Sequence, residues 1–253
     1  MLQHRISEWL SNYLNTAKLD AFIVGVSGGI DSAVVSTLCA TTGIKTIVVS
    51  MPIHQAEDQL TRAKDHIAWL EKSFSNVKSS EVNLTQTFEK FRSLFADDNK
   101  LALANSRSRL RMITLYHIAS QNNGIVVGTG NKIEDFGVGF FTKYGDGGVD
   151  VSPIADLLKT EVWKLGKELG ISQSIIDAKP TDGLWEDDRN DEDQIGASYS
   201  ELEWAMAFLE KNPYFSPSDL NLLTPREKEV ITIYRNLNSR NLHKMQNIPI
   251  FKK

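Results

Sequence analysis

The chain has 253 residues, of which 41% are hydrophobic and 24% charged, and these fractions are typical of a soluble globular protein. No apolar run approaches the ~18 residues that a membrane-spanning helix needs, so we expect no membrane association. The net charge of −4 and the pI of about 5.8 have the wrong sign for general nucleic-acid binding, which requires a basic surface. We therefore expect no nucleic-acid partner, and any recognition of a nucleotide should be local.

The N-terminal segment indicates a protein that is not exported. Its apolar residues have helical spacing and do not form a signal-peptide core. The single cysteine, Cys39, falls in a predicted apolar helix and cannot form a disulfide within the chain. We interpret Cys39 as a small buried hydrophobe, and both observations favour a cytoplasmic location.

Strands and helices alternate along the chain. Continuously apolar runs and one shorter candidate predict strands at 21–26, 45–50, 80–83 and 125–128. Helical spacing predicts helices at 2–14, 31–42, 55–72, 85–95, 100–121, 159–169, 199–210 and 225–236. This alternation predicts an α/β fold with a doubly wound, mostly parallel sheet, in a single domain spanning residues 1–253. The polar, glycine-rich segment 129–152 is long for a connection, so we expect it to bind substrate.

A serine- and glycine-rich loop, Ser27-Gly28-Gly29-Ile30-Asp31-Ser32, follows the first predicted strand and opens the next helix. Its glycines let backbone N–H groups approach a phosphate, and its serine hydroxyls and the helix N-terminus favour an anion. The loop has no lysine and its glycine spacing does not match GxGxxG, so two large classes of nucleotide-binding loop are excluded. The carboxylate at Asp31 would repel a triphosphate unless a divalent cation lay between them, which suggests Mg²⁺. The simpler alternative makes Asp31 a helix cap and the glycines a tight turn.

This loop resembles the pyrophosphatase loop of the N-type ATP pyrophosphatases, a superfamily with a Rossmann-like, adenine nucleotide alpha hydrolase-like fold. Members adenylate a substrate and release pyrophosphate. A second signature, Gly128–Glu134 followed by Gly139–Gly148 and Asp150, closely resembles the substrate segment of NAD synthetases. Four residues, 135–138, separate its two parts where the family pattern has three. Further matches in family order are Arg109 and Arg111 before Met112, Pro153 then Lys159, Pro180-Thr181, Leu184-Trp185-Glu186, Asp191-Glu192 and His243-Lys244.

The resemblance covers nearly the whole chain and is to the short, ammonia-dependent form, because no glutaminase region precedes the loop. It implies a ligase that adenylates the nicotinate carboxylate of deamido-NAD with ATP and amidates it with ammonia, giving NAD, AMP and pyrophosphate. It also implies a homodimer with Mg²⁺ as cofactor. Small-molecule partners are then deamido-NAD, ATP and ammonia.

The resemblance also assigns roles to residues. Asp31 and Glu134 would bind the metal, Lys159 would place a positive charge on the departing phosphates, and Asp146 would orient or deprotonate ammonium. The implied ATP-binding residues are Gly25, Val26, Ser27, Gly28, Gly29, Ile30, Asp31, Ser32, Thr129, Lys159 and Thr181. The implied deamido-NAD-binding residues are Arg109, Lys143, Asp150, His243 and Lys244.

Some features leave alternatives open. The acidic stretch 186–193 is either a solvated loop or a mobile lid that excludes water, and the resemblance favours the lid. The histidines outside the family match have no metal-ligand spacing, so zinc is not expected. Two rival functions remain: another amide- or thiol-forming ATP pyrophosphatase, such as a synthase partner of a separate glutaminase or a tRNA-modifying enzyme, and a nucleotide-binding regulatory module without chemistry.

Overall fold

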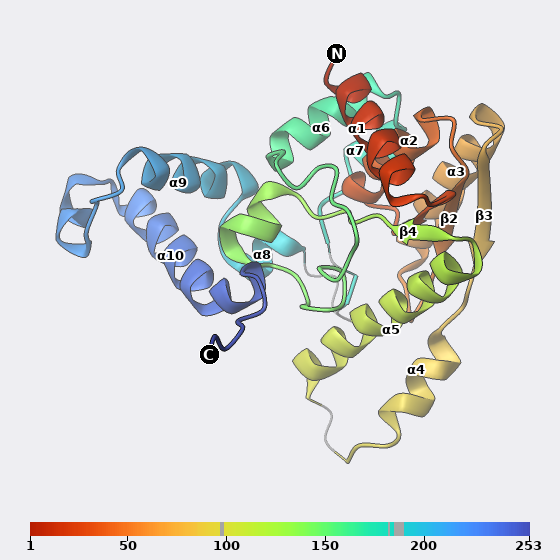
Figure 1. Cartoon of the computed structure of the whole chain (residues 1–253). Coiled ribbons are helices and arrows are strands. Elements are labelled where there is room, and N and C mark those ends of the chain that lie inside the picture. The colour runs from red at the N-terminus through yellow and green to blue at the C-terminus, as the bar shows by residue number, and fades with distance from the viewer. Residues whose placement is uncertain (97–98, 182, 185–189) are drawn as a thin grey trace.

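A computed structural model of the chain describes residues 1–96, 99–181, 183–184 and 190–253. Within these residues, four strands form one sheet in the order β3-β2-β1-β4 (Figure 1). The strands are β1 (Ala21–Gly25), β2 (Thr46–Ser50), β3 (Val77–Glu81) and β4 (Gly124–Val126). All three strand pairs are parallel, which confirms the predicted sheet.

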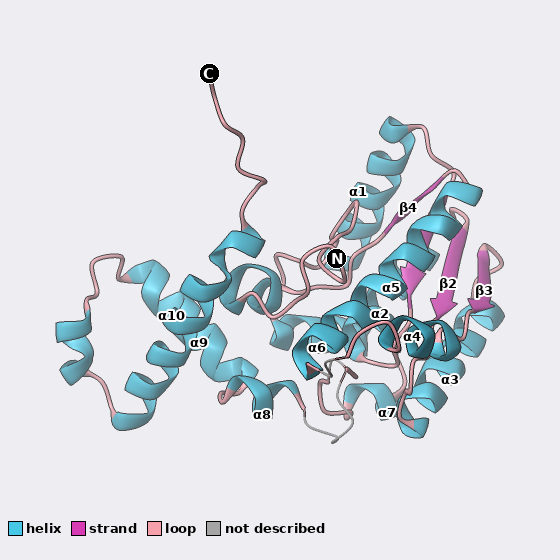
Figure 2. Cartoon of the chain, turned by 90° about the horizontal axis from the view of Figure 1, so that it is seen from below, coloured by secondary structure: helices cyan, strands magenta, loops and turns pink. Residues whose placement is uncertain are grey.

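Helices cover both faces of the sheet, because alternate residues of β1 point to opposite sides. Phe22 and Val24 pack against the helices of one face, and Ala21 and Ile23 pack against those of the other. The first face is covered by α1 (Leu2–Ala17), α2 (Ile30–Thr41), α3 (Glu57–Ser73), α6 (Lys159–Glu168) and α7 (Gln173–Ile176). The second face is covered by α4 (Thr85–Arg92) and α5 (Lys100–Gln121) (Figure 2).

A further layer of helices lies beside the sheet and has its own hydrophobic cluster (Figure 1). Its elements are the π-helix η1 (Ile133–Val138), α8 (Asp191–Ile195), α9 (Tyr199–Lys211), the 3₁₀-helix η2 (Pro217–Leu222) and α10 (Pro225–Met245). Trp163 of α6 packs against this cluster and also against the hydrophobic cluster on the first face of the sheet. That shared contact favours the single domain predicted from the sequence.

The structure differs from the predicted elements in several places, and α7, α8 and η2 were not predicted. The segment 129–152, expected as an irregular loop, contains η1, and α10 continues beyond residue 236 to Met245. The third strand occupies Val77–Glu81 and not 80–83, and its mostly exposed polar residues fit its place at the sheet edge. In the acidic stretch 186–193, residues 186–189 lie outside the described residues, whereas Asp191 begins α8 and is buried.

Burial and helix length bear on two further features of the chain. Cys39 is fully buried in α2, as expected for a small hydrophobe. Among the described helices, none has both the length and the apolar character to cross a membrane.

Candidate active site

The site lies where the strand order reverses direction. From β1 the chain proceeds to β2 and β3 on one side, and β4 then pairs with β1 on the other. In open α/β sheets, ligands bind beyond the carboxyl ends of the strands at such a switch point. A cavity of about 250 Å³ opens there, lined by the loop after β1, the segment after β4 and the start of α6.

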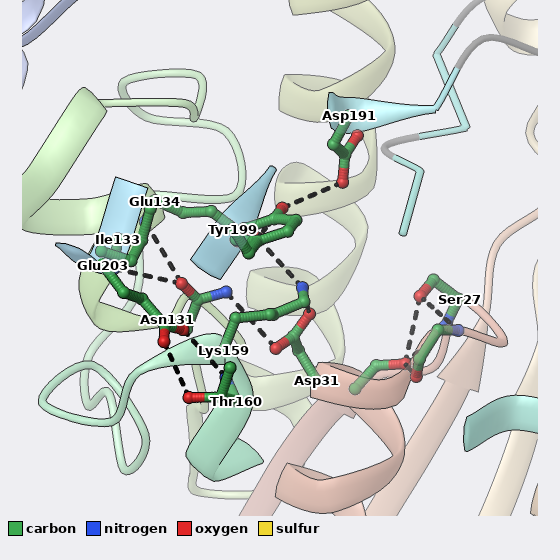
Figure 3. Close-up of polar contacts among 12 residues, drawn as sticks. Ser27, Asp31, Asn131, Ile133, Glu134, Lys159, Thr160, Asp191, Tyr199 and Glu203 are labelled. Atoms are coloured by element: carbon green, nitrogen blue, oxygen red, sulfur yellow. Dashed lines mark hydrogen bonds and ion pairs between the residues drawn. The ribbon is translucent and has the colours of Figure 1, made fainter. Parts of the chain in front are cut away.

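The loop between β1 and α2 is braced by its own serine hydroxyls (Figure 3). The N–H of Gly29 donates to Oγ of Ser27 (3.2 Å), and the N–H of Ser27 donates to Oγ of Ser32 (3.2 Å). The Ser32 hydroxyl donates in turn to the carbonyl of Gly29 (3.0 Å). The loop is therefore shaped before any ligand arrives, with the partially positive end of α2 at the cavity.

Gly28 is the loop position at which the backbone requires glycine. Its φ is +87°, in the left-handed region, and a Cβ there would collide with the carbonyl oxygen of Gln59 in α3. The Arg62 side chain also donates to the Gly28 carbonyl (3.3 Å). Gly28 thus packs the loop onto α3, whereas the other predicted loop residues, Gly25, Val26, Ser27, Gly29, Ile30, Asp31 and Ser32, line the cavity.

Three charged side chains from three elements meet in the cavity (Figure 3). Lys159, at the start of α6, donates to Oδ2 of Asp31 and, at 3.1 Å, to Oε1 of Glu134. Lys159 is only 2% exposed. Burial opposes its charge, but the two facing carboxylates outweigh burial and raise the pKa of Lys159 above its ordinary value. The ammonium group of Lys159 therefore bridges Asp31 and Glu134, the two carboxylates predicted to bind a metal.

Asn131 fixes the backbone and side chains around this cluster. It is fully buried, and its Oδ1 accepts the N–H groups of Ile133 and Glu134, both at 3.2 Å. Its Nδ2 donates to Oδ1 of Asp31 over 3.4 Å. The Asn131 amide thus ties the first turn of α2 to the first turn of η1.

Tyr199 reaches the cluster from α9. Its hydroxyl donates to Oε1 of Glu134 (2.6 Å) and lies 3.2 Å from Oδ2 of Asp191 (Figure 3). Its ring centroid is 4.7 Å from the Lys159 ammonium. Burial, followed by the charges of Glu134 and Asp191, raises the pKa of Tyr199 well above its ordinary value, so its hydroxyl stays a donor.

Comparison with known proteins identifies the family. The sequence profile of NAD synthase matches residues 2–248. An NH3-dependent NAD(+) synthetase of Alkaliphilus metalliredigens is 39% identical over 215 residues, which are 80% of this chain and 84% of that protein. One of Methanosarcina acetivorans is 34% identical over 261 residues, 98% of this chain and 96% of that protein. The chain belongs to the NAD synthase family.

Solved structures of similar proteins share the fold over the whole chain. An NMN synthetase from Francisella tularensis is 30% identical with a TM-score of 0.85, covering 100% of this chain and 98% of that one. An NH3-dependent NAD synthetase from Campylobacter jejuni is 25% identical with a TM-score of 0.79, covering 99% and 98%. The family resemblance predicted from the motifs is confirmed.

The π-helix η1 contains the four residues that follow Glu134, one more than the sequence resemblance led us to expect. A π-turn is closed by an i→i+5 hydrogen bond and so holds one residue more than an α-turn. Here the N–H of Gly139 donates to the carbonyl of Glu134, five residues earlier. The four residues 135–138 are therefore contained within the turn, and Glu134 still faces Lys159.

Asp146 lies at the cavity wall, held by neighbours from α5 and from its own loop. Its Oδ1 accepts the Ser108 hydroxyl (2.6 Å) and the N–H of Thr142 (3.0 Å). Nearby Asp135 also lines the cavity, and burial together with the charges of Glu134, Asp146 and Asp31 raises the pKa of Asp135 to about 8. Two carboxyl groups thus lie near the place where Lys159 meets Glu134.

Three of the five residues predicted to bind deamido-NAD, Arg109, Lys143 and His243, are linked by hydrogen bonds, and the described lining of the cavity includes none of the five. Arg109 Nε donates to the carbonyl of Lys143 (3.2 Å), and Lys143 Nζ donates to the carbonyl of His243 (2.8 Å). Lys244 donates to the carbonyls of Gly139 and Phe141. Phe141 lines the cavity, so Lys244 borders it.

The fifth residue, Asp150, lies in a different environment. Its carboxylate accepts the Tyr116 hydroxyl (2.9 Å) and the N–H of Val126 (2.8 Å). These contacts tie the loop to α5 and β4. The remaining predicted ATP residues, Thr129 and Thr181, both line the cavity.

Sequence reasoning did not identify Asn131 or Tyr199 as functional residues. Asn131 stands inside the quoted Gly128–Glu134 motif, so a buried amide between two acidic site residues was a signal that could have found it. Tyr199 begins a predicted helix shortly after the Asp191-Glu192 match but stands outside the motifs, and no local signal indicates its contact with Glu134. Asp191 was noted as a family match and is now placed beside Tyr199.

Proposed function

We propose that this NAD synthase converts deamido-NAD to NAD, with ATP activating the nicotinate carboxylate and ammonia displacing AMP. The observation that carries the proposal is the Lys159 ammonium held between Asp31 and Glu134, in the cavity that contains the serine-glycine loop. A carboxylate is a poor electrophile, so it needs such an activation step before an amine can attack. The site combines an anion-binding loop, a buried cation and acidic ligands, which is the set that adenylation requires.

Mg²⁺ fits the two carboxylates. Mg²⁺ is usually held by one or two carboxylates together with waters and substrate phosphates, and Asp31 and Glu134 are hard oxygen ligands from adjacent elements. The Lys159 ammonium between them marks a place where positive charge is favourable. Among the described residues, no group of three or more His, Cys, Asp or Glu side chains could hold a metal, so substrate oxygens would complete the shell. When bound, the ion would neutralise charge that develops on the phosphates.

The protein groups have separable tasks in this proposal. The loop from Ser27 to Ser32, with Gly25, Val26, Thr129 and Thr181, would hold ATP, and the N-terminus of α2 would face its pyrophosphate. Lys159 would move its charge from the carboxylates to the departing phosphates. Arg109, Lys143, His243 and Lys244 would bind the anionic groups of deamido-NAD, with Asp150 holding the loop that carries Lys143.

Asp146 would hold ammonium and accept its proton. Its Oδ1 is already fixed by Ser108 and Thr142, so the carboxylate is presented to the cavity in one orientation. A fixed carboxylate binds the cation and can take up a proton as the amine attacks. The same orientation keeps the amine near the activated carbon.

We also propose a homodimer in the cytoplasm. Large apolar side chains are exposed along α1 and α5, including Trp9 (45%), Tyr13 (42%) and Ile113 (66%). Such a surface is typical of an interface. Light scattering after size-exclusion chromatography should give twice the chain mass, and Ile113→Lys should shift it towards the monomer. The single buried Cys39 fits a reducing compartment.

One assay tests the proposed reaction. Purified protein is incubated with deamido-NAD, ATP, Mg²⁺ and ammonium, and NAD, AMP and pyrophosphate are quantified. Equal amounts of the three products are expected. Release of ADP and phosphate would contradict adenylation, ATP binding without turnover would favour a regulatory module, and AMP release without NAD would indicate a different acceptor.

A second acceptor has one observation in its favour, the likeness to the Francisella tularensis NMN synthetase at a TM-score of 0.85. The same amidation applied to nicotinate mononucleotide would give NMN. Comparing kcat/KM for the two acceptors at equal ATP and ammonium separates the two candidates. A ratio above about 10 in favour of the mononucleotide would reassign the substrate.

A further inference from the structure

Tyr199 belongs to the C-terminal layer of helices, yet its hydroxyl contacts a carboxylate of the ATP cavity (Figure 3). It donates to Oε1 of Glu134 over 2.6 Å, and Lys159 donates to the same oxygen over 3.1 Å. That oxygen is therefore held by donors from α9 and from α6. Neither donor lies in the segment that carries Glu134.

The Tyr199 side chain has little freedom to move. It is 0% exposed, and its ring packs edge-on against Trp163, with ring centroids 6.2 Å apart. Its backbone N–H donates to Oε1 of Glu192 (2.8 Å), which fixes the first turn of α9 to α8. The hydroxyl is thus presented from a rigid position.

The backbone of Glu134 is fixed by other groups. Its N–H donates to Oδ1 of Asn131 (3.2 Å), and its carbonyl accepts the N–H of Phe140 (2.9 Å). The remaining freedom lies in the torsions of the side chain, which Tyr199 and Lys159 restrain. If Lys159 turns to phosphate during the reaction, the described hydrogen bond that still orients this carboxylate comes from Tyr199.

We propose that Tyr199 is a positioning residue, which holds Glu134 in the orientation in which Asp31 and Glu134 receive a divalent cation. The inference rests on the proposed function, because it takes these two carboxylates as the metal ligands. A phenol hydroxyl has one proton to donate. Tyr199 donates it to Glu134, whose contact is shorter than that of Asp191. Removing an outer partner that orients a metal ligand typically weakens metal affinity 10- to 100-fold.

Tyr199→Phe tests this role, because it keeps the ring beside Lys159 and Trp163 and removes the donor. Tyr234→Phe is the matched control: Tyr234 is a buried tyrosine of α10 whose ring lies against Gly137, at the other end of η1. Binding of Mn²⁺ to the nucleotide-free protein is measured from the electron paramagnetic resonance of the free ion. We expect Tyr199→Phe to raise the Mn²⁺ Kd about 10-fold and Tyr234→Phe to change it less than twofold.

Kinetics provide a second readout that a purely structural role would not produce. In Tyr199→Phe the Mg²⁺ concentration for half-maximal rate should rise about 10-fold, while kcat at saturating Mg²⁺ stays within about threefold of the wild type. A low kcat that saturating Mg²⁺ does not restore would overturn the positioning role. A lowered unfolding temperature with unchanged Mn²⁺ affinity would overturn it as well.

Glu134→Gln separates failure of this inference from failure of the proposed function. If Glu134→Gln weakens Mn²⁺ binding at least tenfold and Tyr199→Phe binds like the wild type, the Tyr199 inference alone is wrong. If neither substitution changes the Kd, the assignment of the metal ligands fails, and the Tyr199 inference fails with it.

Discussion

Replacing Lys159 with methionine removes the cation between two poorly exposed carboxylates while keeping most of the side-chain volume. Asp31 and Glu134 are 18% and 16% exposed and Lys159 is 2% exposed, so solvent screens the two negative charges weakly. Removing one partner of a buried ion pair typically costs about 3–5 kcal/mol of unfolding free energy. At about 2–4 °C per kcal/mol for a chain of this size, the metal-free variant should unfold on the order of 10 °C below the wild type.

Thermal unfolding in EDTA, followed by circular dichroism from pH 4 to 9, measures this deficit. Burial already raises the pKa of Asp31, and without the opposing charge of Lys159 the facing charge of Glu134 raises it further above the unfolded value of about 4. The folded variant then binds more protons than the unfolded chain, so acidification stabilises it and the deficit narrows as the pH falls from 7 to 4. Mn²⁺ supplied at pH 7 in place of EDTA should restore several degrees, since it replaces the missing cation.

Lys164→Met is the matched control, because Lys164 is an exposed lysine of the same helix. It should unfold within about 2 °C of the wild type, as expected for a solvent-exposed charge. Two outcomes would refute the reasoning: a Lys159→Met protein as stable as this control in EDTA, or a deficit that widens on acidification.

Three further predictions follow from single residues. Asp31→Asn should lower turnover at least about 100-fold, because an amide is a poorer metal ligand than a carboxylate, and should keep a native circular dichroism spectrum. An unfolded Asp31→Asn protein would point to a structural role instead. Gly28→Ala should lower the free energy of unfolding in urea titration by more than about 2 kcal/mol. Gly43→Ala is the control, because Gly43 has a φ of +76° but open space around it, and it should lower that free energy by about 1 kcal/mol. Equal losses would contradict the collision with Gln59. Burial lowers the pKa of His66 from 6.5 to about 4. The free energy of unfolding should therefore fall by about 3 kcal/mol as the pH drops from above 6.5 to 4, because the unfolded chain takes up the proton first. His66→Gln should lose this slope in urea titrations across that range, and a retained slope would assign it to other groups.

The elements were predictable where a local signal decides them. Helix α5 was predicted at 100–121, closing on Asn123-Gly124, and is observed at Lys100–Gln121, where Asn99 is the N-cap. Helix α10 was predicted to end at 236 and continues to Met245. Its last turns are held by tertiary contacts, such as Asn238 donating to the carbonyl of Gly137 (2.7 Å), which periodicity cannot show.

The site was predictable to the extent that its residues stand in contiguous motifs. The loop after β1 and the Gly128–Glu134 segment are local patterns, and parallel pairing of β1 with β4 brings them together. Lys159 taken alone is a helix-start lysine of a common kind, and only its burial between two carboxylates distinguishes it. The role of Tyr199 depends on how α9 packs against η1, which is a property of the folded chain.

The charged groups of the cavity indicate the form in which ATP enters it. Among the described residues that line it, the carboxyl groups are Asp31, Glu134, Asp135, Asp146 and Asp191, and the cationic groups are Arg111, Lys159 and Lys179. The raised pKa of Asp135, about 8, makes that group mostly neutral at pH 7, and burial raises the pKa of Asp31 and Asp146 as well. Carboxyl groups in this number favour cations in the cavity, so ATP should enter as its metal complex and ammonium should concentrate beside Asp146. Above pH 8, ionisation of Asp135 adds one more negative charge, which strengthens the dependence of ATP binding on the metal.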